Sequence, residues 1–390
     1  MMNHQILETE VQEFILQHQK EDFRVISLRK SPFPTVSSAE LAQQIKGFQI
    51  AKSKFPFLSE TKAIFYPPSL NLEQASSWTT AQYKSKLVSG NTLIDLTAGM
   101  GIDAFAFSKE FESVTALERN AELAEISAHN YHVLGQGNLK YLAIDFETFF
   151  HENPDQKWDV IYLDPARRKG SQKKFLLEDL EPNLLEWMTE LLSRTETLMV
   201  KLSPLLDLKM LIDQIPQIHE IHLVAVKNEM KELLLICKKE NNVNPIIKAV
   251  NLESNQFEFV FQFLGESKVE SQLSSVKKYI YEPNSAVLKS GAFKLVGHQF
   301  DLDKLEKNTH LYTSENLVKS FPGKVFKIIE EIKDAKKTIQ NQAFHVVSKN
   351  YPMSVELIRK KYNLKESEAQ TLIFTQSISG KHILKSVRLL

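Results

Sequence analysis

The order of apolar and polar positions divides the chain into a helical part and an alternating part. Up to about residue 85, apolar residues recur at spacings of three and four, which predicts amphipathic helices in stretches such as SSAELAQQIKGFQIAKSKF and LEQASSWTTAQYKSKL. From Thr92 onward, short β-rich runs alternate with helical stretches; the runs are TLIDL, SVTAL, LKYLAI, WDVIYL and TLMVKL. This alternation predicts an α/β fold with a parallel sheet that helices cover on both faces.

The end of the alternating part indicates how the sheet closes. Two consecutive apolar runs, IHEIHLVAV and ELLLICKK, are joined by the short polar segment KNEMK. We therefore expect a Rossmann-like core with a terminal antiparallel hairpin, whereas a dinucleotide-dehydrogenase sheet usually closes with another parallel crossover.

Smaller elements follow the polar break KKENNVNP near residue 243. KAVNL and QFEFVFQFL indicate a strand pair, PNSAVLKSGAFKLVGHQF a helix, and HLYTS a strand. In the last seventy residues we expect the helix KVFKIIEEIKDAKKTI, the strand FHVVS, the helix SVELIRKKY and a hairpin that turns at Ser379-Gly380. The predicted division is a helical region at 1–85, an α/β domain at 86–241, and α+β domains at 242–320 and 321–390.

Composition and charge narrow the possible chemistry. Cys237 is the single cysteine, so disulfides and thiolate zinc sites are excluded, and no metal is expected. The N-terminus does not resemble a signal peptide and no apolar run reaches bilayer length, so we expect a cytoplasmic protein with no membrane partner. Residues 321–390 hold 13 Lys/Arg against 6 Asp/Glu, although the whole chain is neutral. This excess indicates contact with a polyanion, with a solvated face as the alternative.

The segment DLTAGMGID, Asp95 to Asp103, follows an apolar run and opens a helix, as a glycine-rich cofactor loop does. Gly99 and Gly101 allow the backbone to approach a ligand, and N–H groups at the helix start can meet a carboxylate. For Asp103, helix capping is favoured over a ligand role. The cofactor-binding residues predicted in this loop are Asp95, Thr97, Ala98, Gly99 and Gly101.

Carboxylates stand at the ends of four successive predicted strands, at the edge where such sheets bind ligands. After Asp95, Glu118 ends the second strand, where it can accept both ribose hydroxyls, and Arg119 follows it. Asp145 comes after the third strand beside Phe146, a pair suited to an adenine amino group and ring, and Asp164 ends the fourth. Each carboxylate alone is commonly a helix cap or a solvated charge, but the series predicts a site for S-adenosylmethionine (SAM).

The fourth strand runs into Asp164-Pro165-Ala166 and then into Arg167, Arg168 and Lys169. Amino-group methyltransferases carry a D/N-P-P-aromatic tetrapeptide here, whose acidic or amide oxygen and backbone carbonyl orient the acceptor amine. Asp164 and Pro165 fit this pattern, and Ala166 and Arg167 depart from it. A phosphate-bearing substrate would suit the basic residues, so the predicted substrate-binding residues are Arg167, Arg168, Lys169 and Lys201. The alternatives are a solvated loop for the basic run and an ion pair with a neighbouring carboxylate for Lys201.

The sequence resembles class I SAM-dependent methyltransferases that carry a ferredoxin-like segment and a C-terminal THUMP-like domain. The matching residues are LEQASSWTTAQYK, DLTAGMGID, DPARR, KLSP and EPNSAVLKSGAF, and the resemblance covers nearly the whole chain. The resemblance implies that 242–320 is the ferredoxin-like domain and 321–390 the THUMP-like domain. Because THUMP domains bind RNA, it also implies an RNA methyltransferase.

We therefore expect methyl transfer from SAM to a nitrogen, or a ribose oxygen, of structured RNA such as tRNA or rRNA. Asp164 and the Pro165 carbonyl would orient the acceptor, and alignment would supply most of the catalysis. Two alternatives remain: a methyltransferase that acts on a protein or a phosphorylated small molecule, and an RNA-binding protein that keeps SAM as a structural ligand.

Overall fold

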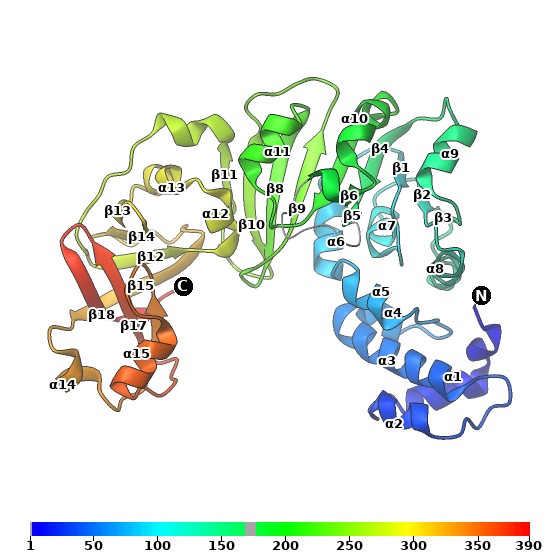
Figure 1. Cartoon of the computed structure of the whole chain (residues 1–390), viewed down its shortest axis with the longest axis horizontal. Helices are drawn as coiled ribbons and strands as arrows, with labels where there is room; N and C mark the ends of the chain where they lie inside the picture. The colour runs from blue at the N-terminus through cyan, green and yellow to red at the C-terminus, as the bar shows by residue number, and fades with distance from the viewer. Residues whose placement is uncertain (1, 168–176) are drawn as a thin grey trace. The chain divides into compact units, whose positions relative to one another are not determined.

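The computed structural model describes residues 2–167 and 177–390 of the chain, which folds into two compact units (Figure 1). The first unit comprises Met1–His219 and Leu234–Asn241, and the second comprises Glu220–Leu233 and Asn242–Leu390. Within the described residues, no helix is both long and apolar enough to cross a bilayer.

The part of the chain before the first strand is helical, as the spacing of its apolar residues predicts. A 3₁₀ turn at His4–Leu7 comes first, and capping residues then set several helix starts. Ser37 and Glu40, for example, form a capping box at the start of α3. The helices are α1 (Thr9–Gln17), α2 (Phe23–Leu28), α3 (Ser38–Lys54), α4 (Pro56–Ser59), α5 (Ser69–Gln74) and α6 (Trp78–Ser85).

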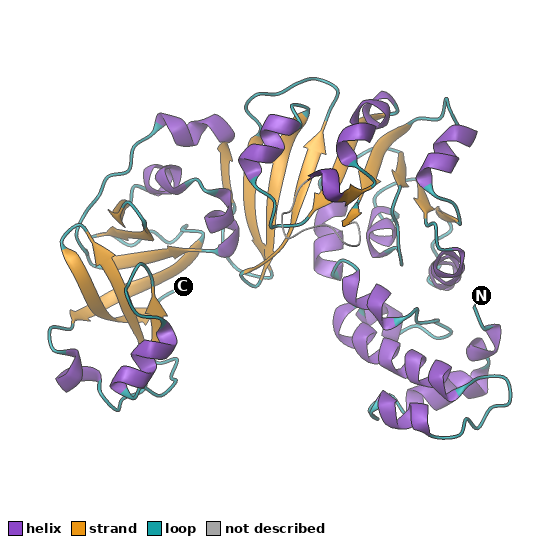
Figure 2. Cartoon of the chain, in the orientation of Figure 1, coloured by secondary structure: helices purple, strands orange, loops and turns teal. Residues whose placement is uncertain are grey.

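The next strands form a parallel sheet in the first unit, and helices alternate with them along the chain (Figure 2). Parallel pairing gives the order β3-β2-β1-β4-β7. The strands are β1 (Thr92–Asp95), β2 (Ser113–Leu117), β3 (Leu139–Leu142), β4 (Trp158–Leu163) and β7 (Thr195–Leu202). The helices are α7 (Ile102–Phe107), α8 (Ala121–Val133), α9 (Phe146–Glu152), α10 (Leu184–Ser193) and α11 (Leu208–Gln214). The predicted α/β class is confirmed.

The predicted terminal hairpin is also present. It consists of β8 (Ile218–Val226) and β9 (Glu229–Cys237), joined by two residues, Lys227 and Asn228, with φ values of 50° and 67°. Positive φ at both residues is the signature of the type I′ turn that matches strand twist in tight hairpins. The strand order places β9 next to β7 and β8 beyond it, followed by β10 (Ile246–Leu252) and β11 (Phe259–Gln262). This is a Rossmann-like sheet whose last strand is inserted before its penultimate one.

The second unit contains a further sheet with the order β13-β14-β12-β15-β18-β17-β16. Its strands are β12 (Tyr279–Pro283), β13 (Asp303–Glu306), β14 (Thr309–Ser314), β15 (Gly323–Glu331), β16 (His345–Ser348), β17 (Thr371–Ser377) and β18 (Gly380–Arg388). Its helices are α12 (Ser285–Ser290), α13 (Phe293–Phe300), α14 (Ala335–Ile339) and α15 (Val355–Tyr362). A 3₁₀ segment, Phe263–Lys268, precedes them.

Two expectations for the second unit are wrong. The segment expected to form a helix over KVFKIIEEIKDAKKTI supplies strand β15, and only Ala335–Ile339 are helical. The apolar spacing fits a helix, but the β-branched residues favour a strand, and β15 gains partners on both sides, β12 and β18. The expected single helix over PNSAVLKSGAFKLVGHQF is broken at Gly291, which has a φ of 71° and ends α12.

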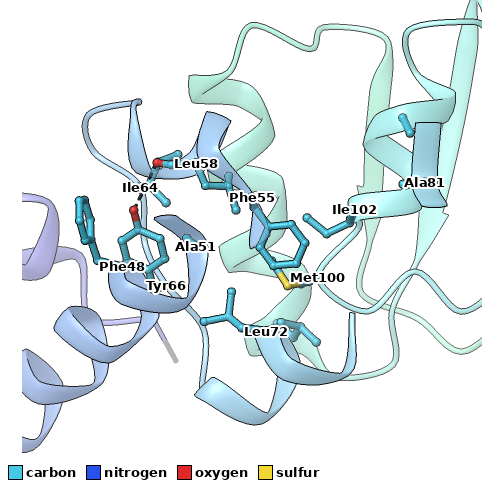
Figure 3. Packing of buried hydrophobic residues seen from close by; sticks show 12 residues of the cluster. Phe48, Ala51, Phe55, Leu58, Ile64, Tyr66, Leu72, Ala81, Met100 and Ile102 are labelled. Carbon is cyan, nitrogen blue, oxygen red and sulfur yellow. Dashed lines mark hydrogen bonds between the residues drawn. The ribbon is translucent and has the colours of Figure 1, made fainter. Parts of the chain in front are cut away.

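The N-terminal helices and the glycine loop share one hydrophobic core in the first unit (Figure 3). Met100 and Ile102, from the loop after β1 and the start of α7, lie among apolar side chains that include Phe55, Leu72 and Ala81. All five are buried, so helices that precede the sheet in sequence fix the position of the loop from one side.

Candidate functional site

The glycine loop connects the end of β1 to α7. Gly101 is the N-cap of α7 and has a φ of 79°, a left-handed conformation that favours glycine. A Cβ at Gly101 would lie 1.5 Å from the Tyr141 hydroxyl oxygen, so any other residue would collide with this ring. Gly99 has a φ of 56°, but apart from its chain neighbours no atom of the described residues lies within 4 Å of where its Cβ would be. Gly101 is therefore required by packing as well as by backbone conformation, and Gly99 by conformation alone.

A cavity of about 130 Å³ opens at this loop. It brings together six of the predicted residues, Asp95, Thr97, Ala98, Gly99, Gly101 and Asp164. Its other lining residues come from the α5–α6 segment, the loop, α7 and β4, and are Asn71, Gln74, Ala75, Ser76, Met100, Ile102, Asp103 and Tyr162. Whole ligand pockets usually measure 300–1,000 Å³, so this cavity is large enough for only part of a cofactor-sized ligand.

Two other predicted cofactor-binding residues lie at the end of β2, outside the lining of this cavity. Glu118 is half-buried, and its carboxylate accepts a hydrogen bond from the Asn120 N–H at 2.7 Å. Arg119 is exposed and pairs with Glu181 at 2.8 Å. The N–H of Glu118 donates to the Leu142 carbonyl at 3.1 Å, so the end of β2 and the end of β3 lie at the same sheet edge.

The remaining pair, Asp145 and Phe146, also lies outside the cavity lining. Asp145 is the N-cap of α9: its carboxylate accepts from the Thr148 N–H at 2.9 Å and from the Thr148 hydroxyl at 2.8 Å. These hydrogen bonds, the backbone one first, lower the pKa of Asp145 below its usual value. Phe146 is buried, and its ring packs edge-on against Trp187 at a centroid distance of 4.9 Å. Both residues have structural roles that do not depend on a ligand.

Asp164 lies directly after β4 and is tied to two other parts of the site. Its N–H donates to the Thr97 hydroxyl at 2.7 Å, and its carboxylate forms a short ion pair with Lys201 of β7. Lys201 therefore forms an ion pair with a neighbouring carboxylate, which was the predicted alternative to a role in substrate binding. Pro165 is buried. Arg167 belongs to the two-residue strand β5 (Ala166–Arg167), which pairs with β6 (Leu180–Glu181), and the predicted Arg168 and Lys169 lie outside the described residues.

Asp103 does not cap α7, contrary to expectation, because Gly101 is the N-cap and no side chain caps this helix. The Asp103 carboxylate instead accepts hydrogen bonds from Ser76 at 2.8 Å and from the Tyr162 hydroxyl at 2.9 Å. Lys84 of α6 lies 3.2 Å from the other carboxylate oxygen and is completely buried. Burial alone would raise the pKa of Asp103, but Lys84 first, then Lys201 and the two hydroxyl donors, lower it below its usual value.

The environment of Asp95 raises the pKa of its carboxyl group, whereas that of Asp103 lowers it. It is 1% exposed and forms no ion pair with any described residue. Burial raises the pKa of Asp95 well above its usual value, and the nearby charges of Asp103 and Asp164 add to this effect. A hydrogen bond from the Thr97 N–H at 3.0 Å and the charge of Lys201 act against it. A cation in the cavity would favour the ionised form of this carboxylate.

Comparison with known proteins identifies the family of the chain. Family models match residues 74–202 (conserved hypothetical protein 95), 279–322 (ferredoxin-like domain) and 323–388 (THUMP domain-like). A solved structure from Porphyromonas gingivalis W83, named as a methyltransferase, matches with 30% identity and a TM-score of 0.88, covering 100% of this chain and 99% of that chain. The chain belongs to this methyltransferase family.

Curated relatives identify the cofactor of the methyltransferase. Proteins from two Mycobacterium tuberculosis strains, CDC 1551 / Oshkosh and ATCC 25618 / H37Rv, are named as uncharacterized SAM-dependent methyltransferases. Each is 18% identical over 316 residues, which cover 79% of this chain and 84% of the relative. The methyltransferase is SAM-dependent, and its anionic cavity beside two glycines fits the cationic groups of SAM. The described residues contain no group of three or more His, Cys, Asp or Glu that could hold a metal ion.

Sequence reasoning missed the contribution of the α5–α6 segment to the site. Asn71, Gln74 and Ser76 line the cavity, and Lys84 supports Asp103 from behind. The motif LEQASSWTTAQYK contains three of these residues, but its pattern is that of an ordinary amphipathic helix with an exposed lysine. Only the fold shows that Lys84 is buried beside a carboxylate 19 positions later in the chain.

Proposed function

We propose that this SAM-dependent methyltransferase modifies a nitrogen, or a ribose oxygen, of structured RNA such as tRNA or rRNA in the cytoplasm. The observation that carries the proposal is the charge of residues 321–390, an excess of seven Lys/Arg over Asp/Glu in a segment that matches a THUMP-like model. A basic surface attracts the RNA backbone regardless of sequence, and the methyltransferase site then acts on a nucleotide within reach.

The basic segment presents many of its charges to solvent without ion pairs. Other cations are paired within the protein: Lys349 with Glu282, and Arg359 with Glu366. Seven lysines are exposed and form no ion pair with any described residue: Lys327, Lys333, Lys336, Lys360, Lys361, Lys365 and Lys381. Unpaired exposed lysines of this kind are available for phosphate contacts.

The chemistry proposed for the site is direct methyl transfer. SAM, when bound, supplies an activated methyl group. Asp164 and the Pro165 carbonyl accept hydrogen bonds from the acceptor group and direct its lone pair at the methyl carbon, and the acceptor loses one proton as the bond forms. Lys201 holds the Asp164 carboxylate in place through the ion pair, and Thr97 holds its backbone. These residues contribute mainly through alignment.

The proposed catalytic domain, 86–241, requires the preceding segment as well, because residues 71–76 complete the cavity. We propose Glu118 with Arg119, and Asp145 with Phe146, as the adenosine side of the SAM site, and Arg167, Arg168 and Lys169 as contacts to substrate phosphates. The Glu118→Ala variant should weaken SAM binding in calorimetry. Unchanged affinity would remove Glu118 from the site.

RNA binding can be tested on the full-length chain with matched lysine variants. The test variant changes Lys333, Lys336, Lys360 and Lys365 to Gln, and the control changes Lys30, Lys62, Lys140 and Lys157 to Gln. All eight are exposed, and none forms an ion pair with a described residue. In filter-binding titrations with tRNA across a salt series, the log–log slope changes by about 0.7–0.9 for each phosphate that the protein no longer neutralises. We expect a flatter slope and weaker binding for the test variant alone.

A product measurement distinguishes the alternatives. Mass spectrometry of RNA nucleosides from cells with and without the gene should reveal one methylated nucleoside that depends on it. If all nucleosides are unchanged and both lysine variants bind RNA equally, the acceptor is a protein or a phosphorylated small molecule. If RNA binds but no nucleoside changes, the protein uses SAM as a structural ligand.

A further inference from the structure

Five charged side chains from five parts of the first unit surround the cofactor cavity. Lys84 of α6 pairs with Asp103 of α7, and Lys201 of β7 pairs with Asp164 after β4. Asp95 at the end of β1 forms no ion pair with any residue that the structure describes. The carboxylates are close enough to interact, because the charges of Asp103 and Asp164 both contribute to raising the pKa of Asp95.

The carboxylates and the lysines differ in their position relative to the cavity. Asp95, Asp103 and Asp164 all line the cavity. Neither lysine does, nor does any other cation among the residues that the structure describes. Lys84 is completely buried behind Asp103, and Lys201 is 17% exposed. A ligand in the cavity therefore meets three carboxylates directly, while the lysines neutralise two of them from behind.

With all five groups ionised, the cluster carries one net negative charge. Asp95 is 1% exposed, so water screens this charge poorly, and its interaction with a ligand is stronger than at the protein surface. Burial is the main cause of the raised pKa of Asp95, and the negative charges of Asp103 and Asp164 add to it, so a cation in the cavity would stabilise the ionised carboxylate.

The cofactor and its product differ by one charge. SAM has an ammonium, a sulfonium and a carboxylate, for a net charge of +1. Methyl transfer converts the sulfonium into a neutral thioether, and the positive charge passes to the acceptor, which releases it as a proton. The product, S-adenosylhomocysteine (SAH), is therefore neutral overall.

We propose that Asp95, Asp103 and Asp164 make the site selective for the charge of the cofactor, so that it binds SAM more tightly than SAH and releases the product once the methyl group has left. This selectivity concerns the donor and is independent of which acceptor the enzyme uses. Asp95 contributes most, because Lys84 and Lys201 compensate the other two carboxylates.

Calorimetry on the full-length protein can test this with three ligands: SAM, SAH and sinefungin. Sinefungin has an amine in place of the methylated sulfur, so it carries the charge of SAM without its methyl donor chemistry. The test variant is Asp95→Asn, whose side-chain oxygen can still accept the Thr97 N–H. The matched control is Asp207→Asn, which removes one exposed carboxylate outside the cavity lining and retains a good helix cap at the start of α11.

We expect the wild type to bind SAM and sinefungin at least tenfold more tightly than SAH, which corresponds to about 1.4 kcal/mol. Asp95→Asn should reduce this ratio at least fivefold, because it weakens the binding of the two positively charged ligands, SAM and sinefungin. An unchanged affinity for SAH would show that the site of the variant is still folded. Asp207→Asn should leave the ratio unchanged.

Three results would overturn the proposal. The first is a wild type that binds SAH as tightly as SAM and sinefungin. The second is an Asp95→Asn variant that binds SAH normally and keeps the wild-type ratio. The third is an equal change of the ratio in both variants, which would indicate that the overall charge of the protein, and not the cavity wall, determines the selectivity.

Discussion

Replacing Lys84 with Met should destabilise the first unit strongly. The Lys84 side chain is completely buried, its ammonium lies 3.2 Å from Asp103 Oδ1, and it also donates to the Ser76 hydroxyl at 3.0 Å. Met fills a similar volume without the charge, so the Asp103 carboxyl group would be left buried without the cation of Lys84. Removing one partner of a buried ion pair typically costs about 3–5 kcal/mol, and we expect a loss of this size.

The natural tryptophans allow the measurement to be made on the first unit alone. All three, Trp78, Trp158 and Trp187, lie in this unit, so tryptophan fluorescence in a urea titration reports its unfolding and not that of the second unit. The control is Lys86→Met, which removes an exposed lysine two positions away and should change the free energy of unfolding by no more than about 0.5 kcal/mol.

A double variant identifies the cause of the loss. Asn at position 103 can still accept the hydrogen bonds from Ser76 and Tyr162, but it needs no cation. Combining Asp103→Asn with Lys84→Met should therefore recover at least about 2 kcal/mol relative to Lys84→Met alone. If Lys84→Met costs less than about 1 kcal/mol, or if the second change recovers nothing, the pair does not stabilise the fold in the way argued from its burial.

Three further outcomes are expected at the site. Gly101→Ala should abolish SAM binding or unfold the loop, because its Cβ would overlap the Tyr141 hydroxyl, whereas Gly99→Ala should have a smaller effect; equal losses in a binding assay would contradict this ranking. SAM affinity should fall as pH drops through the raised pKa of Asp95, since protonation removes its charge, while SAH affinity should change less; calorimetry in alkaline and mildly acidic buffers checks the sign. Asp164→Ala should abolish turnover on the true substrate but leave SAM affinity within a few-fold, and near-normal turnover would exclude its role in orienting the acceptor.

Local patterns predicted the sheet well because its strands are buried and strongly apolar. β1, β2, β4 and the β8–β9 hairpin all lie where the short apolar runs indicated them. The helix expected from Lys324 onward failed because spacing alone does not show what a segment pairs with. In the fold, β15 hydrogen-bonds to β12 and β18, and these long-range contacts decide its structure.

The candidate site could be predicted only where local features of the sequence determine it. The position of Asp95 follows from a strand end and that of Gly101 from a loop motif, and both are local features. The burial of Lys84 and the engagement of Asp103 with Tyr162 depend on how distant elements pack, which no short motif reveals. The capping of α9 by Asp145 was available in the sequence, because Asp145 and Thr148 have the spacing of an N-cap and its third helical residue.

The seven-stranded sheet of the second unit has a consequence for how this family varies. The ferredoxin-like match ends at residue 322 and the THUMP-like match begins at 323, so each supplies one half of the sheet, and the halves meet where β12 pairs with β15 from Tyr279–Lys327 to Pro283–Gly323. A chain that lost either half would expose the edge of a strand that is now hydrogen-bonded on both sides, and such edges promote aggregation. The two matches therefore share one continuous sheet, and we expect relatives to keep or lose both halves together.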